Sequence, residues 1–165
     1  MAKLILFETM PELKKFYLTK EGLDNFKKEY EALKELRIAK ARGNVPEIWE
    51  SEDLNPEYLS FRENVNLLDS KLFELENILK NSKLIKKPLP NRQNVVDFGA
   101  TVLVEVDGQK DEFMLVSSVE SNPAVGKISN ESPVGKALLG HLVGDEVVVS
   151  SSIKVTYKIK KIKYI

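Results

Sequence analysis

The chain has 165 residues, of which 30% are charged and 42% are apolar. This length allows one or two small domains and excludes a large enzyme core, and the composition is that of a folded or coiled-coil protein rather than a disordered one. Lys and Arg together number 25, as do Asp and Glu. This balance excludes a protein that binds nucleic acid through basic charge spread over its whole surface.

The chain contains no cysteine and a single histidine, His141. A disulfide scaffold and a thiolate metal site are therefore excluded, and His141 has no second His or Cys with which to share a transition metal. The opening segment 1–7 has too short an apolar run for a signal peptide, and no later run approaches the length of a membrane span. We expect a cytoplasmic protein that makes no membrane contact.

The hydrophobic pattern changes near Pro88, from helical spacing before it to alternation after it. The stretch 86–91 contains two prolines and no periodicity, which is typical of a linker. The sequence thus predicts an N-terminal helical domain over residues 1–87 and a C-terminal domain over residues 88–165. The pattern of residues 1–16 leaves open whether they add a strand.

A first helix is predicted to begin at Thr19, because Thr is a good N-cap and Glu21 places a negative charge in the first turn. Gly43 is a natural stop for its C-terminal end. Apolar residues recur along the helix at spacings of three and four, at Leu23, Phe26, Tyr30 and Leu33. Near its end the helix carries a basic cluster of Arg37, Lys40 and Arg42.

A second helix is predicted to begin at Pro56, with Asn55 as its N-cap. Its apolar residues follow a heptad repeat typical of a coiled coil: Phe61, Val65, Leu68, Leu72, Leu75 and Leu79. Two helices of about 24 residues span roughly 36 Å each at about 1.5 Å per residue. A modest loop between them favours antiparallel packing, so we expect a hairpin that projects into solvent.

Residues 43–56 form the expected tip of this hairpin. The segment has no Lys or Arg, and its acidic residues are Glu47, Glu50, Glu52 and Asp53. The one tryptophan of the chain, Trp49, lies among them, and we expect it to pack on Ile48 and Val45 and stiffen the loop. Asp53 is the strongest candidate for a functional carboxylate.

The C-terminal part has the alternation of half-buried strands. Residues 102–106 alternate, Asp107-Gly108 is a tight hairpin turn, and residues 153–160 alternate apolar with polar side chains. Residues 133–142 are predicted to form a short helix between these strands. The expected result is an antiparallel sheet with one helix against it, so the fold class of the whole chain is α+β.

Several segments resemble the Gre family of bacterial transcription elongation factors. The most specific is the run 128–140, in which Ser132-Pro133 precedes Ala-Leu-Leu-Gly. Weaker similarity is found at residues 18–23, 98–102 and 143–147, and at Glu57-Tyr58 with Arg62. Together these segments span roughly residues 17–165. The resemblance implies a C-terminal domain with an FKBP-like (FK506-binding-protein-like) fold behind the coiled coil.

The resemblance also implies an activity. Such a factor binds RNA polymerase, inserts its coiled coil into the secondary channel and stimulates cleavage of backtracked nascent RNA near the 3′ end. The tip carboxylates, here Asp53, Glu52 and Glu50, assist catalysis, and Asp53 with Glu52 would share the Mg²⁺ of the polymerase active site. Crowded carboxylates without a basic partner favour a hard divalent cation, although an isolated loop should bind it weakly. The factor would be a monomer with no cofactor of its own and no enzymatic activity alone.

The same resemblance marks residues for partner binding. Asn55, Glu57 and Tyr58 would contact the polymerase from the base of the tip, and Ser132 and Pro133 from the C-terminal domain. Ser132 and Pro133 also fit an ordinary helix start, with Ser as N-cap and Pro at the first position, and both roles are compatible.

The tip departs from the family pattern Gly-Asp-Leu-x-Glu-Asn-x-Glu-Tyr. Residues 52–58 read Glu-Asp-Leu-Asn-Pro-Glu-Tyr. Matching Asp53-Leu54 to Asp-Leu leaves two residues missing before Asn55, including the second acid, whereas an alignment without that gap places Ser51 and Leu54 at the two acidic positions. The alternative is a Gre-like secondary-channel binder that lacks cleavage stimulation and inhibits or modulates transcription. Two further hypotheses are a stand-alone enzyme, for which we find no catalytic constellation, and a coiled-coil adaptor, which would not recover polymerase in a pull-down.

Overall fold

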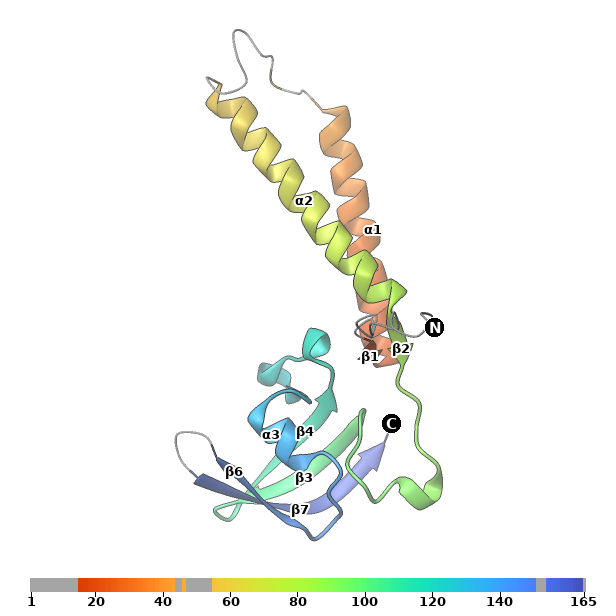
Figure 1. Ribbon diagram of the computed structural model, residues 1–165, viewed down its shortest axis with the longest axis vertical. Helices are drawn as coiled ribbons and strands as arrows, with labels where there is room; N and C mark the ends of the chain where they lie inside the picture. The colour runs from red at the N-terminus through yellow and green to blue at the C-terminus, as the bar shows by residue number, and fades with distance from the viewer. Residues whose placement is uncertain (1–14, 44–45, 47–54, 151–153, 165) are drawn as a thin grey trace, which may run out of the picture.

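A computed structural model describes residues 15–43, 46, 55–150 and 154–164 of the chain. Figure 1 shows a hairpin of two long helices that stands above a curled sheet. The helices are α1 (Lys20–Arg42) and α2 (Pro56–Lys80). This arrangement confirms the predicted α+β fold class, a helical hairpin followed by a small, mostly antiparallel sheet.

The predicted starts of both helices are confirmed by their caps. The Thr19 hydroxyl accepts a hydrogen bond from the Gly22 amide at 3.0 Å, and Asn55 caps α2 directly before Pro56. Gly43 is the C-cap of α1, and its amide donates to the Ala39 carbonyl at 3.0 Å. Local sequence therefore determines where each helix begins and ends.

The apolar seam of the hairpin is most deeply buried in the C-terminal half of α2. Leu68 and Leu75 are buried, as the heptad predicts, while the other predicted seam residues of α2 are only half-buried. Ile78, which the heptad does not include, is also buried. A two-helix hairpin covers its seam from one side only, so much of the apolar stripe stays partly exposed.

A pair of short parallel strands closes the base of the hairpin. β1 (Phe16–Leu18) leads into α1, β2 (Ser82–Leu84) leaves α2, and the two strands pair in register. Leu18 is fully buried, and its carbonyl accepts from the Ile85 amide at 2.8 Å. The helical pattern of the sequence does not predict these strands, and they tie the entry of the hairpin to its exit.

The second part of the fold is a five-stranded sheet in the order β5-β4-β3-β7-β6. Its antiparallel centre includes the turn predicted at Asp107-Gly108, where both residues have positive φ, as a tight hairpin requires. One pair departs from the antiparallel expectation, because β5 runs parallel to β4 after two 3-10 helices replace a tight turn. The strands are β3 (Ala100–Val106), β4 (Gln109–Val116), β5 (Lys127–Ser129), β6 (Glu146–Ser150) and β7 (Lys154–Tyr164), and the 3-10 helices before β5 are η3 (Ser118–Glu120) and η4 (Pro123–Val125).

A single helix, α3 (Pro133–Leu138), joins the sheet in one core. Leu138 is buried among side chains of β3, β4, β6 and β7, including Val104, Leu115 and Ile159. The helix is shorter than the predicted 133–142, because Gly140 has a φ of 83° and its amide donates to the Val96 carbonyl at 2.8 Å. The chain therefore leaves the helix early to pair with the segment before β3.

Candidate functional site

The tip residues predicted to act in catalysis lie outside the described residues. These are Asp53, Glu52 and Glu50, and Trp49 and Glu47 lie there as well. Their flanks are described: α1 ends at Arg42 and α2 begins at Pro56, both at the end of the hairpin far from the sheet (Figure 1). The catalytic and metal-binding roles of the tip stay predictions.

The start of α2 brings three predicted partner-binding residues into one helical turn. The Asn55 side-chain oxygen accepts from the amides of Glu57 and Tyr58 at 3.0 and 3.2 Å. The Glu57 side chain is exposed in the first turn, where the helix dipole favours a negative charge, and Tyr58 is half-buried. The fold therefore presents Glu57 to solvent and uses Asn55 as the cap.

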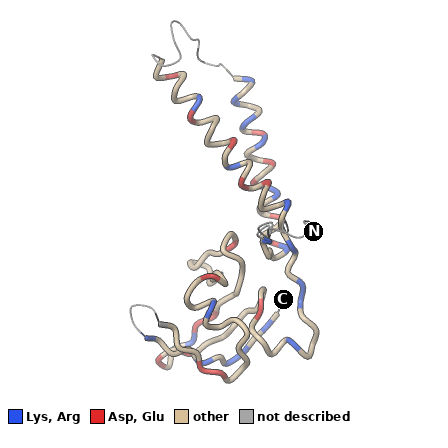
Figure 2. Tube along the Cα trace, in the orientation of Figure 1, with Lys and Arg blue, Asp and Glu red and all other residues tan. Residues whose placement is uncertain are grey.

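The basic cluster of α1 is partly used to hold the hairpin together. The Arg37 guanidinium donates to the Asp69 carboxylate of α2, with Nε 2.7 Å from Oδ1 and Nη2 3.4 Å from Oδ2. The hydrogen bond to Asp69 raises the pKa of Arg37 above its usual value. Lys40 is half-buried and Arg42 is exposed. Figure 2 shows that acidic and basic residues are interspersed along both helices.

Ser132 and Pro133 begin α3 at the surface of the sheet domain. The Ser132 hydroxyl accepts from the Gly135 amide at 3.0 Å and donates to the Ser129 carbonyl at 2.6 Å, which confirms its role as N-cap. Pro133 is exposed at the first helical position. A Cβ on Gly135 would lie 2.0 Å from the Ser129 carbonyl oxygen, so packing alone accounts for this glycine. The partner-binding role of Ser132 and Pro133 stays a prediction.

The turn after α3 exposes aliphatic side chains that the sequence reasoning missed. Leu139, Leu142 and Val143 are 38%, 42% and 48% exposed. Asp145 braces this turn by accepting from the Leu142 amide at 2.8 Å and by contacting His141 Nδ1 at 3.1 Å. These two hydrogen bonds, the one from Leu142 above all, lower the pKa of Asp145. Apolar groups at the surface are a common feature of protein-binding surfaces.

Two general features of the described chain bear on function. Among the described residues, no group of three or more His, Asp or Glu side chains is arranged to hold a metal ion. Within the same residues, no helix combines the length and the apolar character that a membrane-spanning helix needs.

Comparison with known proteins gives a consistent result for both parts of the chain. Residues 16–84 match the family described as "Transcription elongation factor, N-terminal", and residues 90–164 match "Transcription elongation factor, GreA/GreB, C-term".

Individual relatives extend this result to most of the chain. Transcription elongation factor GreA of Thermomicrobium roseum is 35% identical over 136 residues, which is 81% of this chain and 87% of that protein. The GreA protein of Syntrophus aciditrophicus is 39% identical over 148 residues, 83% of this chain and 87% of its own length. The crystal structure of GreA factor homolog 1 of Thermus thermophilus is 25% identical, covers 91% of this chain and 99% of its own, and gives a TM-score of 0.40. The chain therefore belongs to the GreA/GreB family of transcription elongation factors.

Proposed function

We propose that this chain binds RNA polymerase, inserts its helical hairpin into the secondary channel and stimulates cleavage of backtracked nascent RNA. The observation that carries the proposal is a slender two-helix hairpin whose far end leads into an acidic segment, in a chain of the GreA/GreB family. The relatives it matches are named transcription elongation factors.

The dimensions of the hairpin suit this role. α1 has 23 residues, which at about 1.5 Å per residue gives a length of roughly 35 Å. α2 has 25 residues and runs back along it. A two-helix hairpin is narrow enough to enter a channel, and it would carry the tip to a site that the sheet domain cannot reach.

The chemistry of the tip suits a supporting part in catalysis. Mg²⁺ prefers oxygen ligands. In proteins it is usually bound through one or two carboxylates together with water molecules. Asp53 and Glu52 would help to hold the Mg²⁺ of the polymerase, and Glu50 is a third acceptor nearby in sequence. When bound, such a metal ion polarises a phosphate and lowers the pKa of a water. The chain itself would contribute carboxylates that orient that water, with no cofactor and no hydrolytic activity of its own.

The sheet domain would hold the factor on the polymerase surface. Pro133 is exposed at the start of α3, and Ser132 fixes its backbone by capping that helix. The exposed Leu139 lies at the other end of the same helix. A rigid helix with accessible apolar groups is a suitable anchor for a protein partner.

A second function is favoured by the altered tip. The tip lacks one acid of the family pattern when Asp53 is matched with a gap, and both acids when residues are aligned without one. A factor that occupies the channel without placing both carboxylates would block or modulate transcription rather than stimulate cleavage. The binding surfaces would be the same in both cases, so cleavage is the property that separates them.

The deciding experiment is transcript cleavage by a backtracked polymerase complex in Mg²⁺, with binding measured in parallel. The wild type is compared with Asp53→Ala and Glu52→Ala, and with Glu63→Ala as a matched control on the exposed face of α2. Cleavage that is lost in Asp53→Ala while binding is kept supports the carboxylate mechanism. Binding by the wild type without any cleavage overturns the cleavage function and leaves the channel-blocking regulator, and absence of binding overturns both.

A further inference from the structure

One carboxylate of the sheet domain contacts the N-terminus of the first helix of the hairpin. Glu120, at the end of η3, accepts a hydrogen bond from the Thr19 amide at 2.9 Å and a second from the Thr19 hydroxyl. Thr19 is the N-cap of α1, so its hydroxyl donates to Glu120 while it accepts from the Gly22 amide. The cap of the first helix is therefore built jointly by two residues that are 101 positions apart.

Gly22 gives independent support for this close approach. It is buried in the first turn of α1, and a Cβ there would lie 2.4 Å from the Glu120 carboxyl carbon. Glycine inside a helix costs about 0.5–1 kcal/mol relative to alanine. A helical glycine at this position is explained by the space that the Glu120 carboxylate occupies.

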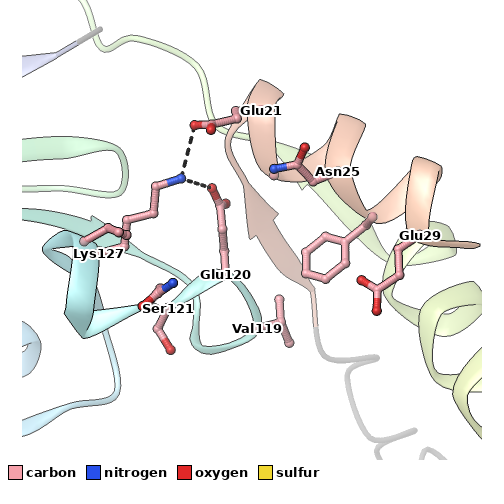
Figure 3. A pocket seen from close by; sticks show the side chains of 11 residues that line it. Glu21, Asn25, Glu29, Val119, Glu120, Ser121 and Lys127 are labelled. Atoms are coloured by element: carbon pink, nitrogen blue, oxygen red, sulfur yellow. Dashed lines mark hydrogen bonds and ion pairs between the residues drawn. The ribbon is translucent and has the colours of Figure 1, made fainter.

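Lys127 completes the contact from the first residue of β5. Its Nζ lies 3.5 Å from Glu120 Oε1 and 3.1 Å from Glu21 Oε2, so one ammonium group connects both parts of the molecule (Figure 3). The Glu120 side chain is only 6% exposed, against 71% for Glu21. A carboxylate that is buried, paired and placed at a helix N-terminus makes an orientation-specific contact.

A second contact between the two parts involves the short strands at the base of the hairpin and the segment before β3. The ring of Tyr17 in β1 stacks on Phe98 with centroids 4.9 Å apart, and Ile85 packs against Gly99. With one contact alone the hairpin could rotate about it relative to the sheet domain, whereas two separate contacts fix the direction of the hairpin. Alongside the Glu120 contact is a groove of about 390 Å³, lined in part by Phe26, Val119 and Val125, which leaves room for the hairpin to tilt if the contact is lost.

We propose that Glu120 is a positioning residue that fixes the direction in which the hairpin leaves the sheet domain. A tilt of about 10° at the base of a helix roughly 35 Å long displaces its far end by about 6 Å. The link to activity rests on the proposed function, because misplacement of a catalytic group by even about 1 Å can cost on the order of 10²-fold in rate. The position of the hairpin itself does not depend on that function.

The same segment connects this contact to the predicted polymerase contact. β5 begins at Lys127 and ends at Ser129, whose carbonyl accepts the hydrogen bond from Ser132. Glu120 and Ser132 thus flank one short stretch of chain. The contact that fixes the direction of the hairpin therefore lies close in the chain to the surface that would bind the polymerase.

The direction can be measured in the free protein. The chain has no native cysteine, so spin labels at Glu63→Cys on α2 and Lys110→Cys on β4, both exposed positions, report one distance across the junction by pulsed electron resonance. The variants Glu120→Ala and Glu120→Gln remove or weaken the contact. Gly22→Ala displaces the carboxylate without changing it, and Glu112→Gln is the control, an exposed glutamate on β4.

We expect one narrow distance distribution for the wild type and Glu112→Gln. Because Glu63 lies part of the way along α2, the same tilt should displace or broaden the distribution by up to about 4 Å for Glu120→Ala and Gly22→Ala. Glu120→Gln should fall between them, because it keeps one acceptor oxygen. Gly22→Ala is the sharpest test, since alanine favours the helix and a purely local role predicts no broadening. Unchanged distributions in both Glu120→Ala and Gly22→Ala, or a broad wild-type distribution, would overturn the proposal. Loss of transcript cleavage with polymerase binding kept in these variants would extend it to activity, and failure of the wild type to cleave affects only the proposed function.

Discussion

Arg37, near the tip end of α1, and Asp69, in the middle of α2, are joined by a two-point ion pair with their closest atoms 2.7 Å apart. Arg37 stands four residues after Leu33, where the spacing of the first helix calls for an apolar side chain. At this position of the α1 stripe, a charged contact therefore takes the place of an apolar one. The two helices are held there by a pair that remains partly open to solvent.

Replacing Asp69 by alanine should lower the free energy of unfolding slightly and make the tip half of α1 exchange its amides faster. The effect should shrink at high salt, because mobile ions screen an exposed pair. Hydrogen exchange at low and high ionic strength checks this. The control is Asp24→Ala, which replaces an exposed aspartate of α1. A loss of protection that is independent of salt would contradict the electrostatic role.

Gly135→Ala should destabilise the sheet domain, because the new Cβ would lie 2.0 Å from the Ser129 carbonyl oxygen, which is backbone and cannot rotate away. Overpacking of this kind costs about 1–3 kcal/mol, more than the helical preference of alanine returns. Urea unfolding measures the change. The control is Lys136→Ala, the next residue on the exposed side, which should stay within about 0.5 kcal/mol of the wild type.

Leu138→Ala should cost about 2–5 kcal/mol, since truncating a buried leucine removes apolar contacts and leaves a cavity. The side chain is 1% exposed and lies in the main core cluster. Its neighbour Leu139 is 38% exposed and should tolerate the same change with little loss. Comparable denaturation midpoints for the two variants would show that α3 does not pack as described.

The stability of the α3–β6 turn should depend on acid. The pKa of Asp145 is lowered from its ordinary value of 3.8, first by the hydrogen bond from the Leu142 amide and then by that from His141. A carboxylate whose folded pKa is depressed contributes stability that is present above the unfolded pKa. That stability is lost as the pH falls through the folded value. Asp145→Asn should therefore reduce the slope of stability against pH below about pH 4, as measured by urea midpoints at a series of pH values. An unchanged slope in this variant would contradict the role of Asp145.

Pro133→Ala should weaken binding to the proposed partner, RNA polymerase, by about tenfold if Pro133 is one of the few residues that dominate the interface. The fold should be kept, because the N-cap bond of Ser132 does not involve the proline ring. Pro123→Ala is the matched control, an exposed proline that also begins a short helix, in η4. Equal affinity of both variants and the wild type would remove Pro133 from the binding surface.

The parts of the fold that depend on short-range chemistry were predictable. The caps at Thr19, Asn55 and Ser132 follow from residue type at a helix start, and the Asp107-Gly108 turn follows from the need for positive φ. Each of these features is decided within a few residues of chain.

The parts that depend on distant pairing were not. The parallel β4–β5 pair, the early end of α3 at the Gly140–Val96 contact and the Thr19–Glu120 bond join segments that no local pattern relates. Gly22 was the one available signal, because a glycine inside a good helical pattern indicates close approach of another group. The predicted site residues of the sheet domain and of the start of α2 are placed by the fold, whereas Asp53, Glu52 and Glu50 lie outside the described residues.

The buried side chains of α2 all lie at or beyond Leu68, so its first turns add only half-buried residues to the seam. Substitutions at the exposed positions of those turns, such as Glu57 and Glu63, should therefore carry little penalty in folding. The exposed face at the start of α2 can thus change its contacts with a partner while the buried part of the hairpin stays the same. Divergent activities within one family are an expected outcome of an architecture that separates its working end from the residues that keep it folded.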